Sequence, residues 1–579
     1  MTYSLHGKGV SRGIALGTAH IVQRDALELL EYPIPEQEVE AEVARLTSAI
    51  DDARRNLRAM RDRIPAQTPA DIAAFIDTHL LMLEDSTLTD EPKRLIRERR
   101  CNAEWAMKLQ RDMIVAAFDQ MDDPYLRTRR DDVDHVINRV LRILLNHPPV
   151  AHEIPESALD GAILIADDLS PADTLLMQHQ GIAAFVTEYG GPTLHTAILA
   201  RSLGVPGIVG VHHARRFIRE GEPLIVDGGE GLVIGEADRR ITEHYRARRD
   251  ERAKRVGGLG KLKRAPTATA DGVTIELQAN VELEVDFDAA RAAGARGVGL
   301  YRTEFLYMNR HDIPTEEEHF AAYRRLVEAF RNQPVTIRTL DIGADKQIEA
   351  SIAARGNAAN PALGLRAVRL ALKEPDLFLP QLRAIVRASG LGQVRLMIPM
   401  LSHLDEVTQV VELIRRVQAE FERQGVPFDP GMPIGGMIEV PAAAAWADGF
   451  ARALDFLSIG TNDLIQYAVA IDRVNEEVSY LYDPLNPGVL RLVSMAIRAA
   501  DAADCPIAMC GEMAGDVRYT KLLLGLGLRV FSVHPSLLLE VKQEIAGTDL
   551  AAVRGTVARA IRTADPVKFK TLVATLTGG

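Results

Sequence analysis

The sequence predicts a multidomain α/β protein: a small α/β domain interrupted by an inserted helical bundle, followed by a (β/α)₈ barrel. Three observations support this fold class. Apolar residues recur at heptad spacing between Val39 and Ile64, short strand-like segments flank that region on both sides, and strand candidates alternate with helical sequence after residue 266. At roughly 100–200 residues per domain, a chain of this length allows about three or four domains.

The opening 22 residues have the pattern of strands and turns, with an apolar segment from Gly13 to Val22. Prolines at 33 and 35 then interrupt the chain. Strand-like segments return after residue 148, at 162–166, 184–187 and 223–226. We therefore expect residues 1–22 and 149–235 to form one α/β domain, into which residues 23–148 are inserted.

The inserted segment has a helical pattern. Its first helix carries an apolar stripe with alternating spacings of four and three, formed by Val39, Val43, Leu46, Ile50, Ala53, Leu57, Met60 and Ile64. Pro65 ends that helix, and a second amphipathic stretch begins near Ile72. Further helical stretches cover 91–120 and 131–145. The segment is predicted to be a bundle of two antiparallel helical hairpins.

Residues 236–265 are charged and helical in pattern, and they end in a basic run from Lys261 to Arg264, which indicates a linker. Residues 266–579 then contain eight strand candidates separated mostly by helical sequence. This alternation predicts a (β/α)₈ barrel, with an open doubly wound sheet as the alternative. The strands are expected to begin near Ile275, Gly297, Val335, Val394, Pro433, Asp455, Pro506 and Phe531.

The composition narrows the class of protein. The formal net charge of -12 argues against a nucleic-acid-binding protein, which normally has a basic face. Only three cysteines occur in 579 residues, so no disulfide framework is expected and a reducing cytoplasm is the natural location. The N-terminus has no apolar signal core, and we find no apolar run long enough to insert into a membrane.

Polar residues follow several of the predicted strands. Because a barrel places its active site at the carboxyl ends of its strands, these residues are expected to converge. Arginines suit phosphate and carboxylate groups, and two nearby carboxylates suit Mg²⁺. Taken singly, each charged residue is more often a surface or ion-pair residue, but five at successive strand ends make a coincidence much less probable. The strand-end motifs are Arg302-Thr-Glu304, Arg338-Thr-Leu-Asp341, Glu439, Thr461-Asn462-Asp463 and Cys510-Gly-Glu512, with Arg473 further on.

Two residues remain ambiguous on this reasoning. Cys510 ends an apolar strand, where a cysteine is commonly a small core residue, although an acid–base role is open. His195 lies in the first turn of a predicted helix, after Gly190 and Gly191. The helix dipole there favours a neutral imidazole, and free backbone N–H groups suit a phosphoryl group. A helix-terminal histidine without a role is the alternative.

Longer motifs resemble a known family. The segment Gly190-Gly-Pro-Thr-Leu-His195-Thr-Ala-Ile-Leu-Ala-Arg-Ser is similar to the phosphohistidine motif of the enzymes that use phosphoenolpyruvate. The segments 299–304, 338–343, 455–467 and 509–515 are similar to their substrate-site motifs. Nearly the whole chain, helical insertion included, resembles the Enzyme I family, the phosphoenolpyruvate–protein phosphotransferases of bacterial sugar phosphotransferase systems.

The resemblance implies an activity and a set of residue roles. His195 would accept the phosphoryl group of phosphoenolpyruvate, with release of pyruvate, in an α/β phosphohistidine domain, and Thr174 would hydrogen-bond that histidine. Cys510 would protonate the enolate carbon. Glu439 and Asp463 would hold Mg²⁺. The substrate-binding residues would be Arg302, Arg338, Asn462, Asp463, Arg473, Lys346 and Arg366.

The resemblance also implies partners. A small histidine phosphocarrier protein of the HPr type would dock on the inserted bundle and receive the phosphoryl group, and the barrel would form a homodimer. The linker would allow the phosphohistidine domain to move between the barrel and the carrier. We expect the sugar-transport branch over the nitrogen-regulatory branch, because no N-terminal sensory domain is recognised.

Three departures from the family pattern bear on rate and partner preference: Pro192, Leu194 and Ala344. Competing hypotheses are a dikinase, a non-catalytic regulator of the same family and a pyruvate-handling aldolase-type barrel. A dikinase needs a nucleotide-binding domain, for which the sequence has no glycine-rich motif. A regulator would not need His195, Cys510 and the carboxylates, and an aldolase-type barrel would not need His195.

Overall fold

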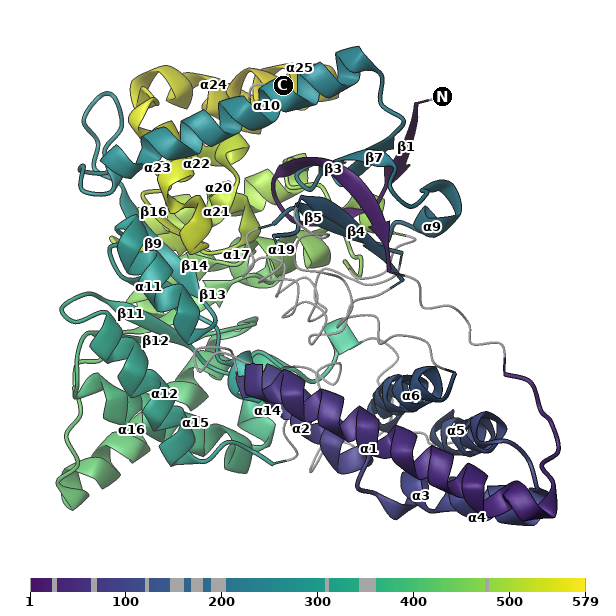
Figure 1. Ribbon diagram of the computed structural model, residues 1–579. Coiled ribbons are helices and arrows are strands. Elements are labelled where there is room, and N and C mark those ends of the chain that lie inside the picture. The colour runs from purple at the N-terminus through teal and green to yellow at the C-terminus, as the bar shows by residue number, and fades with distance from the viewer. Residues whose placement is uncertain are drawn as a thin grey trace. The chain divides into compact units, whose positions relative to one another are not determined.

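The computed structural model describes residues 2–22, 29–63, 70–119, 124–145, 161–167, 181–188, 205–307, 312–342, 361–473 and 478–577 (Figure 1). The chain divides into two compact units, Met1–Lys254 and Arg255–Gly579. The first unit contains an eight-stranded sheet and a helical bundle, and the second contains a closed barrel. No described helix is both long enough and apolar enough to cross a membrane.

The sheet of the first unit joins the two ends of the expected α/β segment. Its strand order is β1-β8-β7-β3-β4-β5-β6-β2. Strand β3 pairs in parallel with β4, with Thr18 opposite Ala162, and antiparallel with β7. The strands are β1 (Tyr3–His6), β2 (Lys8–Ser11), β3 (Ile14–Ile21), β4 (Ala162–Ala166), β5 (Ala184–Thr187), β6 (Gly207–Val209), β7 (Pro223–Asp227) and β8 (Leu232–Gly235), with a short helix α9 (Ala214–Phe217).

Buried apolar side chains explain why these strands form where they do. Every residue of β4 and β5 is buried, which is typical of parallel strands covered on both faces. Strand β3 lies in the middle of the sheet, between β7 and β4, and both of these neighbours follow the helical segment in the sequence.

The helical segment contains η1 (Glu36–Glu38), α1 (Val39–Arg63), α2 (Ala70–Met82), α3 (Ser86–Thr89), α4 (Glu91–Arg99), α5 (Ala103–Asp119) and α6 (Pro124–Leu144). The predicted heptad stripe is buried from Val39 to Leu57, where Leu46 and Ala53, for example, are 0% exposed, whereas Ile64 lies outside the described residues. The bundle therefore forms by packing this stripe against neighbouring helices.

The bundle is more divided than two simple hairpins. Residues 91–120, expected to be helical throughout, form two helices, because Arg100 has a left-handed backbone conformation (φ 52°) that ends α4. Helix α6 also begins at Pro124, earlier than the expected residue 131. Proline suits this first position because its missing N–H has no helical partner there.

The predicted linker is largely helical. Helix α10 (Arg239–Gly258) is followed by the 3₁₀ helix η3 (Leu259–Leu262), and the boundary between the two units falls within α10. Arg248 on α10 pairs with the buried Asp227 of β7 at 3.2 Å. Leu259 of η3 is buried in the second unit.

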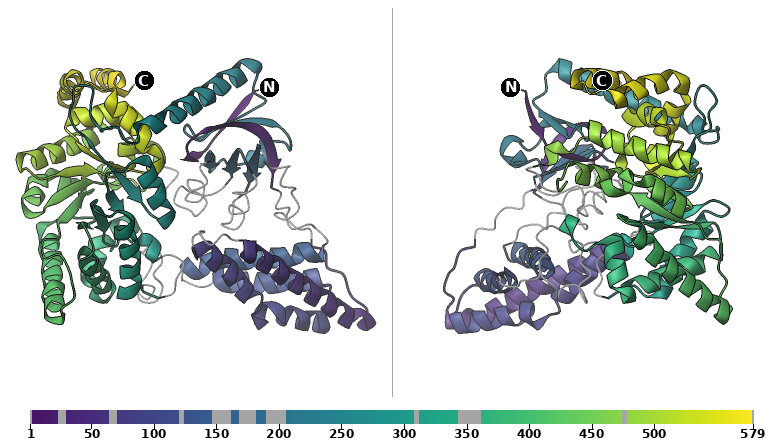
Figure 2. Two further views of the ribbon diagram at one scale, coloured as in Figure 1. Left: turned by 60° about the vertical axis from the view of Figure 1, so that its left-hand side comes forward. Right: turned by 180° about the vertical axis from the view of Figure 1, so that it is seen from behind.

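Eight parallel strands close the barrel of the second unit, so the barrel prediction is confirmed and the open sheet is wrong (Figure 2). Every strand begins within one residue of its predicted start. The strands are β9 (Glu276–Val281), β10 (Val298–Tyr301), β11 (Val335–Arg338), β12 (Val394–Ile398), β13 (Ile434–Ile438), β14 (Phe456–Ile459), β15 (Ile507–Met509) and β16 (Val530–Val533).

Amphipathic helices cover the barrel. On α16, for instance, the buried residues Val407, Val410, Ile414, Val417 and Phe421 follow helical spacing, so one face packs inward. The longer helices are α11 (Glu284–Ala293), α12 (Glu316–Ala329), α14 (Ala367–Lys373), α15 (Pro375–Ser389), α16 (Leu404–Gln424), α18 (Ala447–Ala453), α19 (Thr461–Ala468), α20 (Pro487–Ala502), α22 (Thr520–Leu526), α23 (Leu538–Ala546), α24 (Leu550–Arg562) and α25 (Pro566–Thr577).

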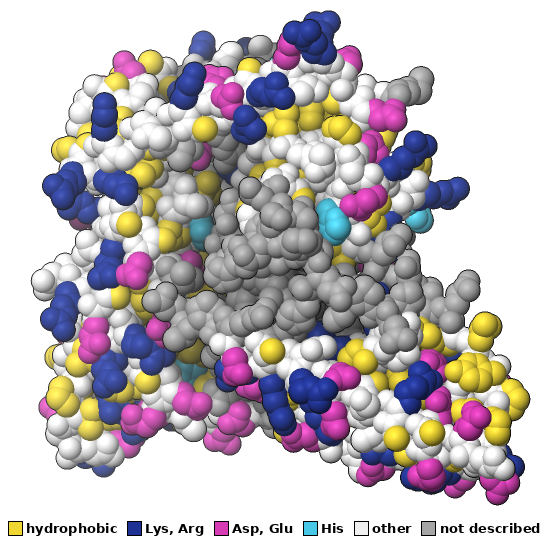
Figure 3. Space-filling view, viewed as in Figure 1, with side chains coloured by type: hydrophobic (Ala, Val, Ile, Leu, Met, Phe, Trp, Pro, Cys, Tyr) yellow, Lys and Arg dark blue, Asp and Glu magenta, His cyan; other side chains and the backbone are white. Residues whose placement is uncertain are grey.

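Shorter helical turns complete the second unit: η4 (Glu304–Leu306), η6 (Pro361–Leu363), α17 (Pro441–Ala445), η7 (Ser479–Leu481), α21 (Glu512–Gly515), η8 (Val517–Tyr519) and η9 (Pro535–Leu537). Several of them, such as η4 and α21, directly follow the carboxyl ends of barrel strands. Basic and acidic side chains are interspersed on the molecular face shown in Figure 3.

Candidate active site

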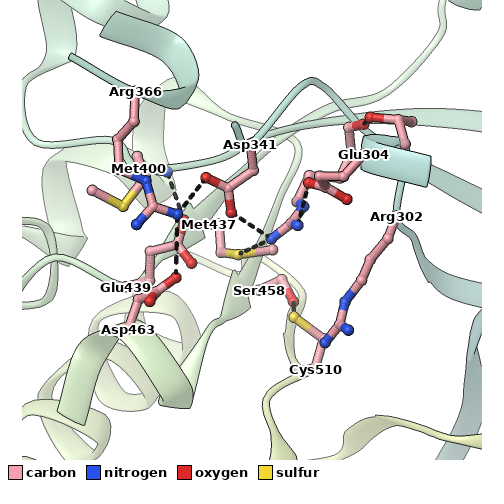
Figure 4. A network of polar contacts seen from close by, with 12 residues as sticks. Arg302, Glu304, Asp341, Arg366, Met400, Met437, Glu439, Ser458, Asp463 and Cys510 are labelled. Atoms are coloured by element: carbon pink, nitrogen blue, oxygen red, sulfur yellow. Dashed lines mark hydrogen bonds and ion pairs between the residues drawn. The ribbon is translucent and has the colours of Figure 1, made fainter. Parts of the chain in front are cut away.

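The carboxyl ends of the barrel strands carry most of the predicted polar residues. Arg302 follows β10, Arg338 ends β11, Glu439 follows β13 and Cys510 follows β15. Asn462 and Asp463 begin α19 directly after β14. A close view shows that Arg302, Arg366, Asp341, Glu439, Asp463 and Cys510 converge from these different segments (Figure 4).

Two arginines share one carboxylate at the centre of the site. Arg338 lies 2.5 Å from Glu304 Oε1 and 3.0 Å from Asp341 Oδ2. Arg366 donates to the other oxygen, Asp341 Oδ1, at 2.8 Å, and to the Tyr467 hydroxyl at 3.2 Å. Since both oxygens of Asp341 are engaged, this carboxylate orients the two guanidinium groups relative to each other.

Asp341 also belongs to a buried group of three carboxylates. One oxygen from each of Asp341, Glu439 and Asp463 lies within 4.8 Å of the other two. Burial, followed by the charges of Asp341 and Asp463, raises the pKa of Glu439 to about 8, although Arg338 opposes the shift. Three carboxylates this close cannot all be ionised cheaply without additional positive charge.

The arrangement fits a divalent cation. Asp463 Oδ1 is buried and has no hydrogen-bond partner among the described residues. The guanidinium group of Arg473 lies 3.9 Å from this oxygen, and that of Arg366 lies 3.9 Å from Asp463 Oδ2. Asp341, in contrast, has each oxygen paired with an arginine. Glu439 and Asp463 are therefore the freer ligands, and hard cations such as Mg²⁺ use one or two such carboxylates.

The backbone fixes Glu439 in place. The Met400 N–H donates to Glu439 Oε1 at 2.6 Å, and Met400 has a left-handed conformation (φ 58°) that is unusual for its residue type. A Cβ atom at Gly460 would lie only 2.6 Å from Glu439 Oε2. A strained residue and an obligatory glycine thus hold one carboxylate, which is common at functional sites.

Arg302 and Asn462 lie beside the carboxylate group. Arg302 forms an ion pair with Glu282, which follows β9. Asn462 Oδ1 accepts from the Glu512 N–H at 2.9 Å, and its Nδ2 donates to Glu512 Oε1 at 3.3 Å. Both residues present polar groups at the same end of the barrel as Arg338, so the site suits a small anion with more than one acidic group.

Cys510 places a neutral thiol in this site. Its side chain is 3% exposed, and Ser458 Oγ donates to Sγ at 3.2 Å. Burial raises the pKa of the Cys510 thiol, and the nearby Ser458 and Arg338 only partly oppose that shift. Because a raised pKa keeps the proton on sulfur at neutral pH, Cys510 can donate one.

Several predicted residues lie outside the described part of the chain: His195, Thr174 and Lys346, together with Pro192, Leu194 and Ala344. The structure brings together the remaining predicted site residues at one end of the barrel. It also adds contacts that the sequence reasoning missed. Glu304 and Asp341 had been noted only as strand-end residues, and Glu282 not at all, although it too directly follows a strand.

Comparison with protein families agrees with the fold. The PEP-binding domain of the PEP-utilising enzymes matches residues 257–550, their N-terminal domain matches residues 6–129 and their mobile domain matches residues 158–231. The match over the barrel, which covers more than half of the chain, defines the class: a PEP-utilising enzyme.

Curated relatives narrow the class. A phosphoenolpyruvate-protein phosphotransferase of Cupriavidus necator is 47% identical over 573 residues, which cover 98% of each chain. That of Geobacillus stearothermophilus is 40% identical over 96% of this chain and 95% of its own, and that of Staphylococcus carnosus is 37% identical over 99% of each. The chain belongs to the phosphoenolpyruvate–protein phosphotransferase family.

Proposed function

We propose that this protein transfers the phosphoryl group of phosphoenolpyruvate to its own His195, releasing pyruvate, and then to a histidine of an HPr-type carrier protein. This is the first step of a phosphotransferase system for sugar uptake. The observation that carries the proposal is the 47% identity to a phosphoenolpyruvate-protein phosphotransferase over 98% of both chains. The polar groups at the barrel's carboxyl end supply independent support.

The arginines of the site bind the substrate. Phosphoenolpyruvate carries a phosphate and a carboxylate, and guanidinium groups match both with paired donors. Arg338, Arg366 and Arg473 lie around the carboxylate group, Arg302 lies nearer Cys510, and Asn462 adds an amide. Lys346 is assigned to the same role by its position in the family motif. Asp341 positions Arg338 and Arg366.

Glu439 and Asp463 hold Mg²⁺ in this proposal, and Asp463 also borders the bound substrate. A bound Mg²⁺ neutralises charge on the phosphoryl oxygens. Two observations support the assignment: Asp463 Oδ1 has no hydrogen-bond partner among the described residues, and the pKa of Glu439 is raised because the negative charge of the buried carboxylates is not fully compensated, a deficit that a cation would remove. Phosphoryl transfer depends mainly on such positioning and charge neutralisation.

Cys510 completes the first half-reaction. When the phosphorus–oxygen bond of phosphoenolpyruvate breaks, the phosphoryl group joins a nitrogen of His195 and an enolate of pyruvate remains. The Cys510 Sγ–H protonates the enolate carbon, and the resulting thiolate regains a proton from solvent. Thr174 would hydrogen-bond His195 and orient its ring.

Each domain is assigned a separate function in this proposal. We assign residues 1–22 and 149–235 to the phosphohistidine domain, residues 23–148 to carrier binding, residues 236–265 to the linker, and residues 266–579 to substrate binding and homodimer formation. Rearrangement of the linker would let one histidine serve two sites. A cytoplasmic location follows from the nature of the substrate and of the carrier.

The function is tested with labelled phosphoenolpyruvate. The purified chain is incubated with Mg²⁺ and [³²P]phosphoenolpyruvate in the absence of nucleotide. We expect covalent label that is acid-labile and base-stable, as phosphohistidine is, and that chases to an added HPr-type carrier. Absence of label in the wild-type protein contradicts the proposal.

Replacement of Cys510 by alanine tests the proton donor. Because general acid catalysis commonly contributes about 10²–10⁴-fold, pyruvate formation is expected to slow by about 100-fold or more. Cys505→Ala is the matched control, since Cys505 is also buried but precedes the amino end of β15, whereas Cys510 follows its carboxyl end. Stopped-flow assay of pyruvate measures both. Equal turnover in the two variants removes the role assigned to Cys510.

A further inference from the structure

A second group of positive charges lies within the barrel unit. It lines a pocket of about 470 Å³ that contains no acidic side chain. We call this the basic pocket. Its six cationic residues are Lys263, Arg264, Arg291, Arg296, Arg331 and Lys542.

The basic pocket is separate from the candidate active site. Arg296 and Gln333, both of which line it, each precede a barrel strand by two residues. The pocket therefore lies at the amino ends of β10 and β11, whereas Arg302 and Arg338 lie at their carboxyl ends. A ligand here would not compete directly with a substrate bound among those arginines.

The positive charge of the pocket is largely uncompensated. Arg291 forms an ion pair with Asp288. The side chains of the other five cationic residues form no hydrogen bond or ion pair with any described residue. Lys542 is the most constrained of them, since it is only 5% exposed and its pKa is lowered by burial and by the charge of Arg296. Burying an ammonium beside a guanidinium is costly unless an anion accompanies them.

The pocket also brings the end of the linker against the barrel. Lys263 and Arg264 directly follow η3, and η3 packs against α23, the helix that carries Lys542. Gly294 allows the close approach. Its φ is 80°, and a Cβ atom there would lie 2.5 Å from the Lys263 carbonyl oxygen. Cationic residues from the end of the linker and from the barrel therefore line the same pocket.

We propose that the basic pocket binds a compact anion carrying at least two phosphoryl groups, and that this anion bridges the linker end to the barrel. The cationic residues come from the linker end, α11, the segments before β10 and β11, and α23, so donors approach from several directions. A tetrahedral phosphoryl group offers oxygens in several directions, whereas a carboxylate offers two in one plane.

The lining of the pocket argues against a nucleotide as the preferred ligand. Bases commonly stack on exposed aromatic side chains. Phe330 is the aromatic residue of this pocket, and it is 2% exposed. The ligand class is therefore a small polyphosphorylated metabolite or inorganic pyrophosphate, which share the same recognition chemistry.

The proposal is tested by calorimetric titration of the full chain with inorganic pyrophosphate and, separately, with fructose 1,6-bisphosphate. Chelator is present, so that metal bridging at the carboxylates does not contribute. One site per chain is expected. Tighter binding of pyrophosphate identifies an inorganic ligand, and tighter binding of the bisphosphate identifies an organic one.

Variants locate the binding site. Arg296→Gln with Arg331→Gln is expected to weaken binding by about tenfold or more, because the variant loses charge-assisted hydrogen bonds to the anion. The control pair Arg415→Gln with Arg416→Gln, on the exposed face of α16, makes the same change in net charge and is expected to have little effect. Lys542→Met tests the buried cation separately.

Four outcomes overturn the proposal. The first is an absence of binding, and the second is equal affinity in the pocket and control pairs. The third is loss of binding in Arg302→Gln, which would place the ligand in the candidate active site. The fourth is tighter binding of citrate than of either phosphorylated probe, which would replace the ligand class by polycarboxylates.

Discussion

His195→Ala is expected to abolish incorporation of label from phosphoenolpyruvate. In the proposed mechanism the arginines of the barrel site bind the substrate, Glu439 and Asp463 would hold Mg²⁺, and Cys510 supplies a proton, so the phosphoryl acceptor is assigned to His195. His195 lies outside the described residues, but the sequence predicts that it begins a helix, where the dipole would favour a neutral imidazole and backbone N–H groups would stabilise the transferred phosphoryl group. Labelling with [³²P]phosphoenolpyruvate measures the effect.

The matched control is His6→Ala. His6 is an exposed residue of β1, in the sheet that also contains β5, the strand leading towards His195. This variant is expected to label as the wild type does. Acid-labile label that persists in His195→Ala, or that disappears in His6→Ala, contradicts the assigned acceptor.

Glu439→Gln is expected to lower the rate of Mg²⁺-dependent transfer by about 1000-fold, because metal-ion charge stabilisation supplies several kcal/mol in such reactions. The substitution preserves shape, and the Met400 N–H can still donate to the amide oxygen. The substitution removes one negative charge from the group of three buried carboxylates. Initial rates at varied Mg²⁺ concentration distinguish weaker metal binding from a slower chemical step.

Glu439 should also make the stabilising effect of Mg²⁺ on the folded protein depend on pH. In the metal-free protein the pKa of Glu439 is about 8, above its ordinary value of 4.5. The folded state therefore holds the proton more tightly than the unfolded state, and this group contributes stability that is full below pH 4.5 and is lost as the pH rises through about 8. Mg²⁺ needs the ionised carboxylate, so it should raise the melting temperature more at pH 8.5 than at pH 6.

Calorimetric melting at the two pH values measures this difference. Glu439→Gln should remove most of the pH dependence of the Mg²⁺ effect. Glu276→Gln is the control, since it alters a carboxylate at the amino end of β9, where Gln278 donates to it. An equal Mg²⁺ effect at both pH values in the wild type contradicts the role of Glu439.

The barrel strands were predictable because they are short, mostly apolar and buried on both sides, a pattern that leaves little ambiguity when it recurs between helices. The helical stretch at 91–120 was not, because its interruption depends on one residue, Arg100. Arginine ordinarily favours helix, and nothing in the local sequence indicates that its backbone is left-handed.

The site was partly predictable for a related reason. Residues such as Arg338 and Glu439 directly follow apolar strands, and strand ends meet at one end of a barrel. The role of Asp341 depends on where two arginines from different segments place their guanidinium groups. That is a property of three-dimensional packing, which spacing along one strand does not encode. Glu282 also directly follows a strand, but its role depends on its ion pair with Arg302 from the next strand end, which the sequence does not encode.

The central position of β3 has a consequence for how the chain is made. Both of its neighbours, β4 and β7, lie beyond the helical segment, so during synthesis β3 emerges long before any strand it can pair with. The bundle can fold from contiguous sequence in the meantime, whereas the sheet must close a long loop, a step that is entropically costly and slow. A nascent chain that ends before residue 162 is therefore expected to expose an unpaired, half-apolar strand. Such a strand either binds a chaperone or aggregates with other chains.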